Sequence, residues 1–226
     1  MPLIFSGITT KGSFGLVYTL PPKIYDLWSW GRNSYGLLGL GNTTNYSSPK
    51  QVGSLTPWLR ISAGYNHSLA IKTDGTMWSW GMNPHGQLGL GNLTYRSSPV
   101  QVGALTTWLT IASGSYHSMA IKTDGTMWGL GGRNSNGQLG LSNTTNYSSP
   151  KQVGALTNWL NIASGSYHNM AIKTDGTMWA WGNSSSGRLG IGNSATVYVS
   201  SPVRVGALTT WSTVDAGGQH TMAISN

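Results

Sequence analysis

The sequence contains no cysteine and no glutamate, and only 8% of its 226 residues are charged. Without cysteine, the fold cannot depend on disulfides or on a thiolate metal site, and the redox compartment stays undetermined. No stretch approaches the roughly 20 apolar residues that cross a bilayer, and the first residues lack the pattern of an ordinary signal peptide. We therefore expect no transmembrane span, and the localisation stays open.

Carboxylates are scarce as well. The five acidic residues are all aspartates: Asp26, Asp74, Asp124, Asp175 and Asp215. Three of them fall in predicted hairpin turns, and the serines beside the histidines recur as copies instead of forming one unique triad. An enzyme rarely repeats its active site in every unit. We therefore predict a non-catalytic protein without a cofactor.

The net charge is +8, which raises the question of nucleic-acid binding. Clustered lysine and arginine would gain affinity by releasing counterions from phosphates. The 13 basic residues are instead scattered, with no run and no arginine-rich arm. A sparsely charged surface that lacks acidic residues explains the charge better than a dedicated nucleic-acid site.

Tryptophan, in contrast, recurs with a fixed period. Successive positions are 50, 50 and 51 residues apart in the first of three series, and the other two keep nearly the same spacing. The series are Trp28, Trp78, Trp128 and Trp179; Trp58, Trp108, Trp159 and Trp211; and Trp30, Trp80 and Trp181. A unit of this size cannot bury its own apolar face and must stack on copies of itself. The chain is therefore predicted to be a repeat protein.

Within one unit, apolar residues alternate with a period of two, which is typical of β-strands. One strand covers 117–121, an Asp-Gly pair makes a tight turn, and 126–128 begins the returning strand. A third strand fits 108–113, and a short fourth strand fits 100–103. Each repeat is thus predicted to be a four-stranded antiparallel sheet.

The segment WGRNSYGLLGLGN, followed by a proline, a strand and AGYNHSLAIKTDGTMWSWG, resembles the repeat of the regulator-of-chromosome-condensation family. The resemblance covers residues 25–226, and residues 1–24 lie outside the repeats. It implies an all-β fold, a β-propeller, usually of seven blades, closed by a sheet built from both ends of the chain. We expect 25–226 to form the propeller and 1–24 to be a non-repeat segment that serves as a docking arm.

Strand counting places blades at 49–81, 99–131 and 150–182, followed by a last one, 202–226, that lacks its final strand, the one that carries the W-x-W-G motif. Residues 25–31 carry that missing strand, with Trp28 and Trp30 in it. The expectation is therefore a ring of four blades, closed where 25–31 pairs with 220–225. An open arc, or two chains that exchange strands into an eight-bladed ring, are the alternatives.

Histidines occupy one equivalent position in each repeat: His67, His117, His168 and His220. On the axis of a closed ring, four imidazoles could bind zinc, nickel or copper. The place of these histidines in the family repeat implies instead a hydrogen bond to a neighbouring loop. We favour the hydrogen bond and predict no metal.

The long loops between repeats contain tyrosines and asparagines at equivalent positions: Tyr46, Tyr95, Tyr147 and Tyr198, and Asn42, Asn92, Asn143 and Asn193. Tyrosine among small polar residues suits a contact surface for a glycan or a protein. Each tyrosine could equally pin its own loop against the blade. Both interpretations stay open.

The family resemblance suggests guanine nucleotide exchange on a small GTPase, or chromatin binding. The chain has no insertion that breaks the repeat symmetry, no acidic surface and no basic tail. We predict instead a structural or adhesion component on the surface of a large assembly such as a bacteriophage virion. Its partners would be other proteins of the assembly, bound through residues 1–24, and a surface glycan or host receptor. A lectin-like propeller is the alternative.

Overall fold

The computed structural model describes residues 25–53, 57–192, 195 and 197–226, which fold almost entirely into β-strands. Three complete sheets each contain four antiparallel strands in sequence order. They are β3 (Trp58–Ala63), β4 (His67–Lys72), β5 (Met77–Gly81) and β6 (Arg96–Gln101); β7 (Trp108–Ser113), β8 (His117–Lys122), β9 (Met127–Gly132) and β10 (Lys151–Gln152); and β11 (Trp159–Ser164), β12 (His168–Lys173), β13 (Met178–Asn183) and β14 (Tyr198–Arg204). The predicted four-stranded antiparallel unit is confirmed.

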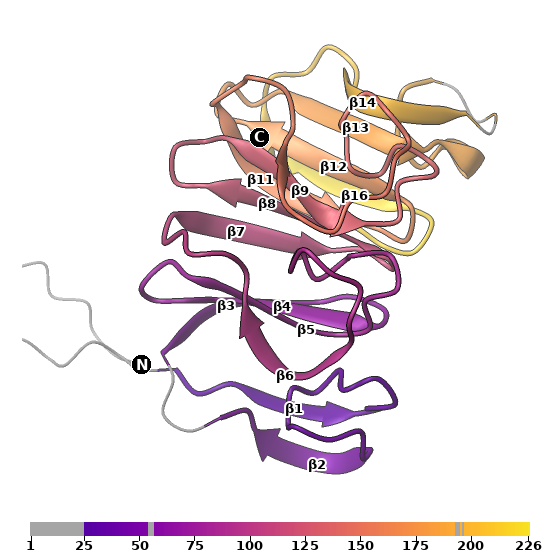
Figure 1. Ribbon diagram of the computed structural model, residues 1–226. Coiled ribbons are helices and arrows are strands. Elements are labelled where there is room, and N and C mark those ends of the chain that lie inside the picture. The colour runs from indigo at the N-terminus through magenta and orange to yellow at the C-terminus, as the bar shows by residue number, and fades with distance from the viewer. Residues whose placement is uncertain (1–24, 54–56, 193–194, 196) are drawn as a thin grey trace, which may run out of the picture.

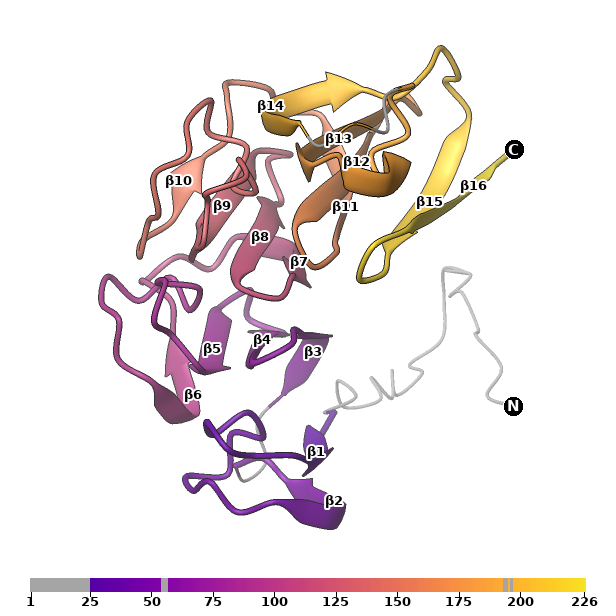
Figure 2. The same cartoon turned by 90° about the vertical axis from the view of Figure 1, so that its right-hand side faces the viewer.

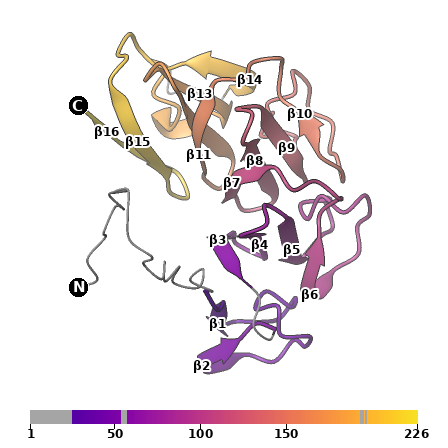
Figure 3. The ribbon, with the colours of Figure 1, turned by 90° about the vertical axis from the view of Figure 1, so that its left-hand side faces the viewer.

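Two further sheets have only two strands each. β1 (Trp28–Gly31) pairs with β2 (Tyr46–Gln51), and β15 (Trp211–Ala216) pairs with β16 (Thr221–Ser225). The sheets stack along a curved arc with these half-sheets at its two ends (Figures 1 and 2). The first strand of each complete sheet contacts the first strand of the next, so β3, β7, β11 and β15 line the inner side of the arc (Figure 3).

The blade boundaries differ from the sequence prediction by one strand. Each repeat has a strand that contains or directly follows a Ser-Ser-Pro sequence, which we call the serine-proline strand. The predicted blades 49–81, 99–131 and 150–182 join each serine-proline strand to the repeat that follows it. In the structure β6 pairs with the preceding β5, and β14 pairs with the preceding β13. Each serine-proline strand is therefore the outer edge of the blade before it, reached by a long loop that folds back. This strand also starts earlier than predicted, at Arg96 instead of Val100.

The predicted closure of the ring is not formed. Among the described residues β1 pairs only with β2, and β16 pairs only with β15. The two half-sheets lie apart at the ends of the arc (Figure 2). Large side chains fill the space between neighbouring blades and set the angle at which the blades stack, and four blades at this angle do not bring the ends together. The chain therefore adopts the open arc.

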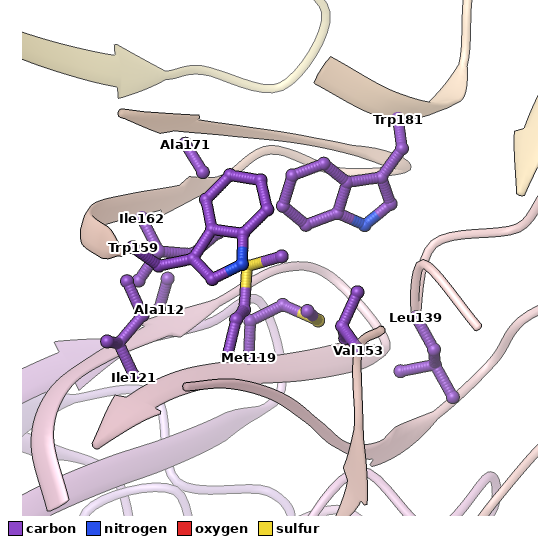
Figure 4. Packing of buried hydrophobic residues seen from close by; sticks show 10 residues of the cluster. Ala112, Met119, Ile121, Leu139, Val153, Trp159, Ile162, Ala171 and Trp181 are labelled. Carbon is purple, nitrogen blue, oxygen red and sulfur yellow. The ribbon is translucent and has the colours of Figure 1, made fainter. Parts of the chain in front are cut away.

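Tryptophan and methionine fill the interfaces between blades. Trp159 and Trp181 of the third complete blade lie against Met119 and Ile121 of the second (Figure 4). Burying one tryptophan removes roughly 150 to 250 Å² from water, which contributes on the order of 4 to 6 kcal/mol before entropy is counted. The periodic tryptophans are thus packing residues first of all.

The Asp-Gly hairpins are built in the same way in each complete blade. Asp74 accepts hydrogen bonds from the backbone NH and from the hydroxyl of Thr76. The hydroxyl oxygen of Thr76 in turn accepts a hydrogen bond from the indole NH of Trp78. These bonds from Thr76 hold the pKa of Asp74 below its usual value. The Lys72 ammonium lies 3.8 Å from the centre of the Trp78 ring. The lysine of this motif therefore packs on the face of a tryptophan ring.

The described part of the chain has one short 3₁₀ turn, η1 (Ser185–Gly187), as its only helical element. Within these residues no helix is long and apolar enough to cross a membrane.

Candidate interaction surface

Three of the repeated histidines, His67, His117 and His168, are buried between the blades, whereas His220 is exposed at the end of the arc. Each Nε2 lies within hydrogen-bond distance of a side chain at the start of the second strand of the next blade: His67 to Ser118 Oγ (2.8 Å), His117 to Asn169 Oδ1 (2.9 Å) and His168 to Thr221 Oγ1 (3.1 Å). Burial lowers the pKa of His67 to about 3 and the pKa values of His117 and His168 to about 4. These imidazoles are therefore neutral at physiological pH.

The side chains that contact the histidines also donate hydrogen bonds to a loop. Ser118 Oγ donates to Gln87 O at 2.7 Å, and Asn169 Nδ2 donates to Gln138 O at 2.7 Å. Each histidine thus joins its own blade to the next one and to the loop between them. Within the described residues no three histidine or aspartate side chains gather at a point where they could hold a metal ion.

Steric crowding explains why glycine stands three residues before each histidine. A Cβ on Gly114 would collide with the ring of His117 and with the carbonyl of Gly165 in the next blade. The G-x-x-H element therefore allows the imidazole to lie flat beneath the turn.

The predicted loop asparagines organise their own loops. Asn33 Nδ2 donates to Asn42 O at 2.9 Å, and Asn42 Oδ1 accepts the backbone NH of Thr44 at 3.0 Å. Asn92 and Asn143 accept the equivalent backbone bonds. Asn193 lies outside the described residues. These amides are engaged within their loops, which leaves less of them for a ligand.

The predicted loop tyrosines divide into two groups. Tyr46 and Tyr147 are partly buried, and their hydroxyls accept hydrogen bonds from Asn42 and Asn143 of the same loops. Tyr95 and Tyr198 are exposed. In the described structure the first pair fits the loop-pinning interpretation, while the second pair remains accessible to a partner.

A set of aromatic residues that the sequence analysis passed over lies at one end of the blades. Tyr65, Tyr116 and Tyr167 occupy the short turns before the histidines, and the long loops meet them there: Arg133 N donates to Tyr116 O at 2.8 Å. The ring of His85 lies 5.7 Å from that of Tyr116, and the guanidinium of Arg133 lies 5.9 Å from the centre of the Tyr167 ring. We call this end of the blades the loop face. Its signal in the sequence is a tyrosine close before each of the first three repeat histidines: two residues before His67, and directly before His117 and His168.

The loop face is hollowed on the inner side of the arc. A depression of about 290 Å³ is lined by the short turns of four successive blades, with Gly64, Gly114, Gly165 and Gly217 among its walls. Small residues make up most of its lining, and Tyr65 is the one turn tyrosine that borders it among the described residues.

Charge also distinguishes the loop face. The long loops 32–45, 82–95 and 133–146 contain no carboxylate, and they carry Arg32, His85 and Arg133. The turn aspartates Asp74 and Asp124 lie at the opposite end of the blades, in the β4–β5 and β8–β9 hairpins. Arg32 and Arg133 therefore give these loops a positive charge, whereas burial and the neighbouring Arg133 lower the pKa of His85; Asp215 lies at this end of β15.

The family model described as the RCC1-like domain matches residues 25–226. The chain belongs to the RCC1-like family. It is 36% identical over 208 residues to the probable E3 ubiquitin-protein ligase HERC6 of Homo sapiens, covering 88% of this chain and 15% of that protein. It is 31% identical over 204 residues to the ultraviolet-B receptor UVR8 of Arabidopsis thaliana, covering 88% of this chain and 35% of the receptor. The RCC1-like chain thus spans well under two thirds of either relative.

Solved structures share the fold. Prp20p of Saccharomyces cerevisiae superposes with a TM-score of 0.77 at 21% identity, covering 87% of this chain and 50% of Prp20p. Human WBSCR16 superposes with a TM-score of 0.58 at 20% identity, covering 88% of this chain and 67% of WBSCR16. The chain is an RCC1-like β-propeller interaction module, and its arc follows the curvature of half of the Prp20p chain.

Proposed function

We propose that this RCC1-like module binds a partner protein through its loop face, and that the partner presents an acidic surface. The observation that carries the proposal is the combination of accessible tyrosines with His85 and Arg133 on loops that contain no carboxylate. Tyrosine and arginine are enriched where proteins bind one another, and complementary charge speeds association.

Binding to proteins is consistent with what is known of structural relatives. Prp20p was studied for its binding to Gsp1p and histones. Yeast RCC1 (Prp20) was solved with Kap60 bound. These partners belong to those proteins; for the present chain they support only the general class of ligand.

The more specific functions inferred from the sequence stay predictions. The docking arm of an assembly component, such as a virion protein, falls on residues 1–24, which lie outside the described residues. Glycan adhesion would depend on loop tyrosines, of which Tyr95 and Tyr198 are exposed. A glycan array on the purified chain tests that alternative, and glycan binding lost on replacing these two tyrosines would favour it over a protein partner.

The test of the proposal uses a glutamate-rich peptide and a glutamine-rich peptide of the same length. We expect the first to bind, more tightly at low salt, and the second not to bind. Arg133→Ala should weaken binding, whereas Arg204→Ala, at the opposite end of β14, should leave it unchanged. Equal binding of both peptides, or equal loss in both variants, would contradict the proposal.

A further inference from the structure

The two half-sheets at the ends of the arc are complementary parts of one blade. β15 and β16 correspond to β3 and β4, the inner strands of a complete blade, because His220 follows Trp211 as His67 follows Trp58. β1 and β2 correspond to the outer strands β5 and β6. Among the described residues, the C-terminal end of the arc therefore lacks the outer half of a blade, and the N-terminal end lacks the inner half.

We propose that two copies of this chain complete each other, with β16 of each copy pairing with β1 of the other to form an eight-bladed ring. The register follows from the complete blade, in which Ser68 opposes Trp80 and Leu69 opposes Ser79. By equivalence Thr221 opposes Trp30 of the second copy, and Met222 opposes its Ser29. The two junctions are identical, as a twofold axis requires.

Burial shows that both edges are unfinished. Met222 is 69% exposed, whereas its counterpart Leu69 is 1% exposed. Trp30 is 59% exposed, whereas its counterpart Trp80 is 3% exposed. Large apolar residues at repeat positions that are otherwise buried indicate a surface that another blade half covers.

Each edge also has a hollow where the missing half belongs. Beside β16 lies a cavity of about 590 Å³ whose lining includes Arg188, Val205, Trp211 and Ala223. In the proposed ring, β1 of the second copy, with Trp28 and Trp30, would occupy this position beside β16.

The hollow at the other end has the matching character. It measures about 230 Å³, and its lining includes Leu27, Trp30 and Ile61. Ile61 is 66% exposed, whereas the equivalent Ile111 is packed against Leu69 and Ile71 of the blade before it. Met222 and Ile224 are the counterparts of Leu69 and Ile71, so in the ring they would cover Ile61 of the second copy.

Hydrogen bonding identifies the partner of Trp30. Leu37 O accepts from both Ser68 Oγ at 2.9 Å and Trp80 Nε1 at 2.7 Å. Gln138 O likewise accepts from both Asn169 and Trp181. The equivalent carbonyl, Arg188 O, accepts from Thr221 Oγ1 at 2.8 Å. In the ring its second donor is the indole NH of Trp30 from the other copy.

The histidine series extends across the same junction. His220 ends the series that passes from blade to blade, and in the next blade of the ring the counterpart of Ser118 is Ser68, in β4 of the second copy. The space beside Gly187 is consistent with this junction. A Cβ on Gly187 would meet nothing within 4 Å, whereas a Cβ on its counterpart Gly137 would collide with Ser200 of the next outer strand. The counterpart of Ser200 is Ser47 of the second copy.

A second copy is favoured over closure within one chain. The half-sheets stand at opposite ends of the arc (Figure 2), and the arc superposes on about half of Prp20p, with coverage of 50%. Two such arcs turn through a whole circle, and eight blades lie within the known range for propellers. Because each copy brings one half-blade of each kind, the pairing completes both half-blades formed by the described residues.

The first experiment measures the mass of the unsubstituted chain in solution by sedimentation equilibrium. We expect about twice the 24.0 kDa of one chain. A single-chain mass at every concentration would overturn the proposal.

The second experiment exploits the absence of cysteine. A chain with Ser29→Cys is mixed with an equal amount of a chain with Met222→Cys and oxidised; we expect a cross-linked pair on denaturing gels. Lys50→Cys, one strand further out than Ser29, is the control and should not cross-link with Met222→Cys.

A chain carrying both Ser29→Cys and Met222→Cys separates the two ways of closing a ring. It should form covalent pairs of chains; an internal disulfide at single-chain mass would show a four-bladed ring and overturn the proposal. Absence of any cross-link between chains whose far-ultraviolet circular dichroism is unchanged would also overturn it.

Discussion

His117 and Asn169 join two blades through a hydrogen bond of 2.9 Å between the imidazole Nε2 and the amide oxygen. The amide nitrogen of Asn169 donates in turn to the carbonyl of Gln138. Neutral histidine is required for this arrangement because both groups are buried, and a buried charge without a counter-ion is costly. The contact repeats along the arc, so the blades share a dependence on the protonation state of histidine.

Acid should therefore destabilise the arc. Because the pKa of His67 falls from 6.5 to about 3, and those of His117 and His168 to about 4, the unfolded chain binds more protons below pH 6.5. Stability is fully present above pH 6.5 and falls as the pH drops towards 4, by about 2 kcal/mol per histidine at pH 5. Urea unfolding at pH 8 and pH 5 measures this loss. His67→Gln should make the pH dependence of stability shallower. Equal unfolding midpoints of the unsubstituted chain at pH 8 and pH 5 would contradict the prediction.

Asn169→Ala should be severely destabilising. It leaves Nε2 of His117 and Oγ of Ser164 without the amide oxygen that they contact, at a cost of about 2 to 4 kcal/mol, while the carbonyl of Gln138 keeps its second donor, Trp181. Chemical denaturation measures the change in the free energy of unfolding. Thr144→Ala, on an exposed part of the same loop that contains Gln138, is the control and should change stability by less than about 0.5 kcal/mol. Equal effects of both substitutions would refute a role for the amide.

Gly114→Ala should also destabilise the protein, because the added methyl group meets the ring of His117 and the carbonyl of Gly165. Overpacking of this kind costs about 1 to 3 kcal/mol. Gly218→Ala is a matched control, since its Cβ would have only the Ser166 hydroxyl as a neighbour, at 3.5 Å. Thermal unfolding of both variants checks the prediction, which fails if their midpoints fall together.

Trp30→Ala and Trp80→Ala should separate association from folding. Trp80 is buried, and its truncation should lower the free energy of unfolding by about 3 to 5 kcal/mol. Trp30 is exposed in the single arc, so its truncation should weaken the pair of chains and leave the isolated arc folded. Sedimentation and circular dichroism on the same samples measure the two effects. Loss of structure in Trp30→Ala at single-chain mass would show that Trp30 acts within one chain.

Local patterns accounted for the repeat and most strands. The alternation in 108–113 and 117–121 matches β7 and β8 because strand formation there depends on side chains that point alternately to two sides of a sheet. The Asp-Gly pairs mark the hairpins, since Gly125 adopts a positive φ of 75° that glycine tolerates. The tyrosines before the histidines were equally visible, but a tyrosine in a turn carries no sign of whether it is exposed.

Pairing partners and ring closure depended on the tertiary structure. The serine-proline strand has a strand before it and another after it along the chain, and only the backbone pairing of β6 with β5 and of β14 with β13 shows which one it joins. Closure depends on the angle between blades, which the volume of buried side chains such as Trp159 and Met119 sets. The sequence by itself determined that the chain is built from stacked four-stranded sheets, because the period and the alternation are local properties. Only the tertiary structure decided that the arc stays open with a half-blade at each end, because that outcome is the sum of many small angles that no single repeat encodes.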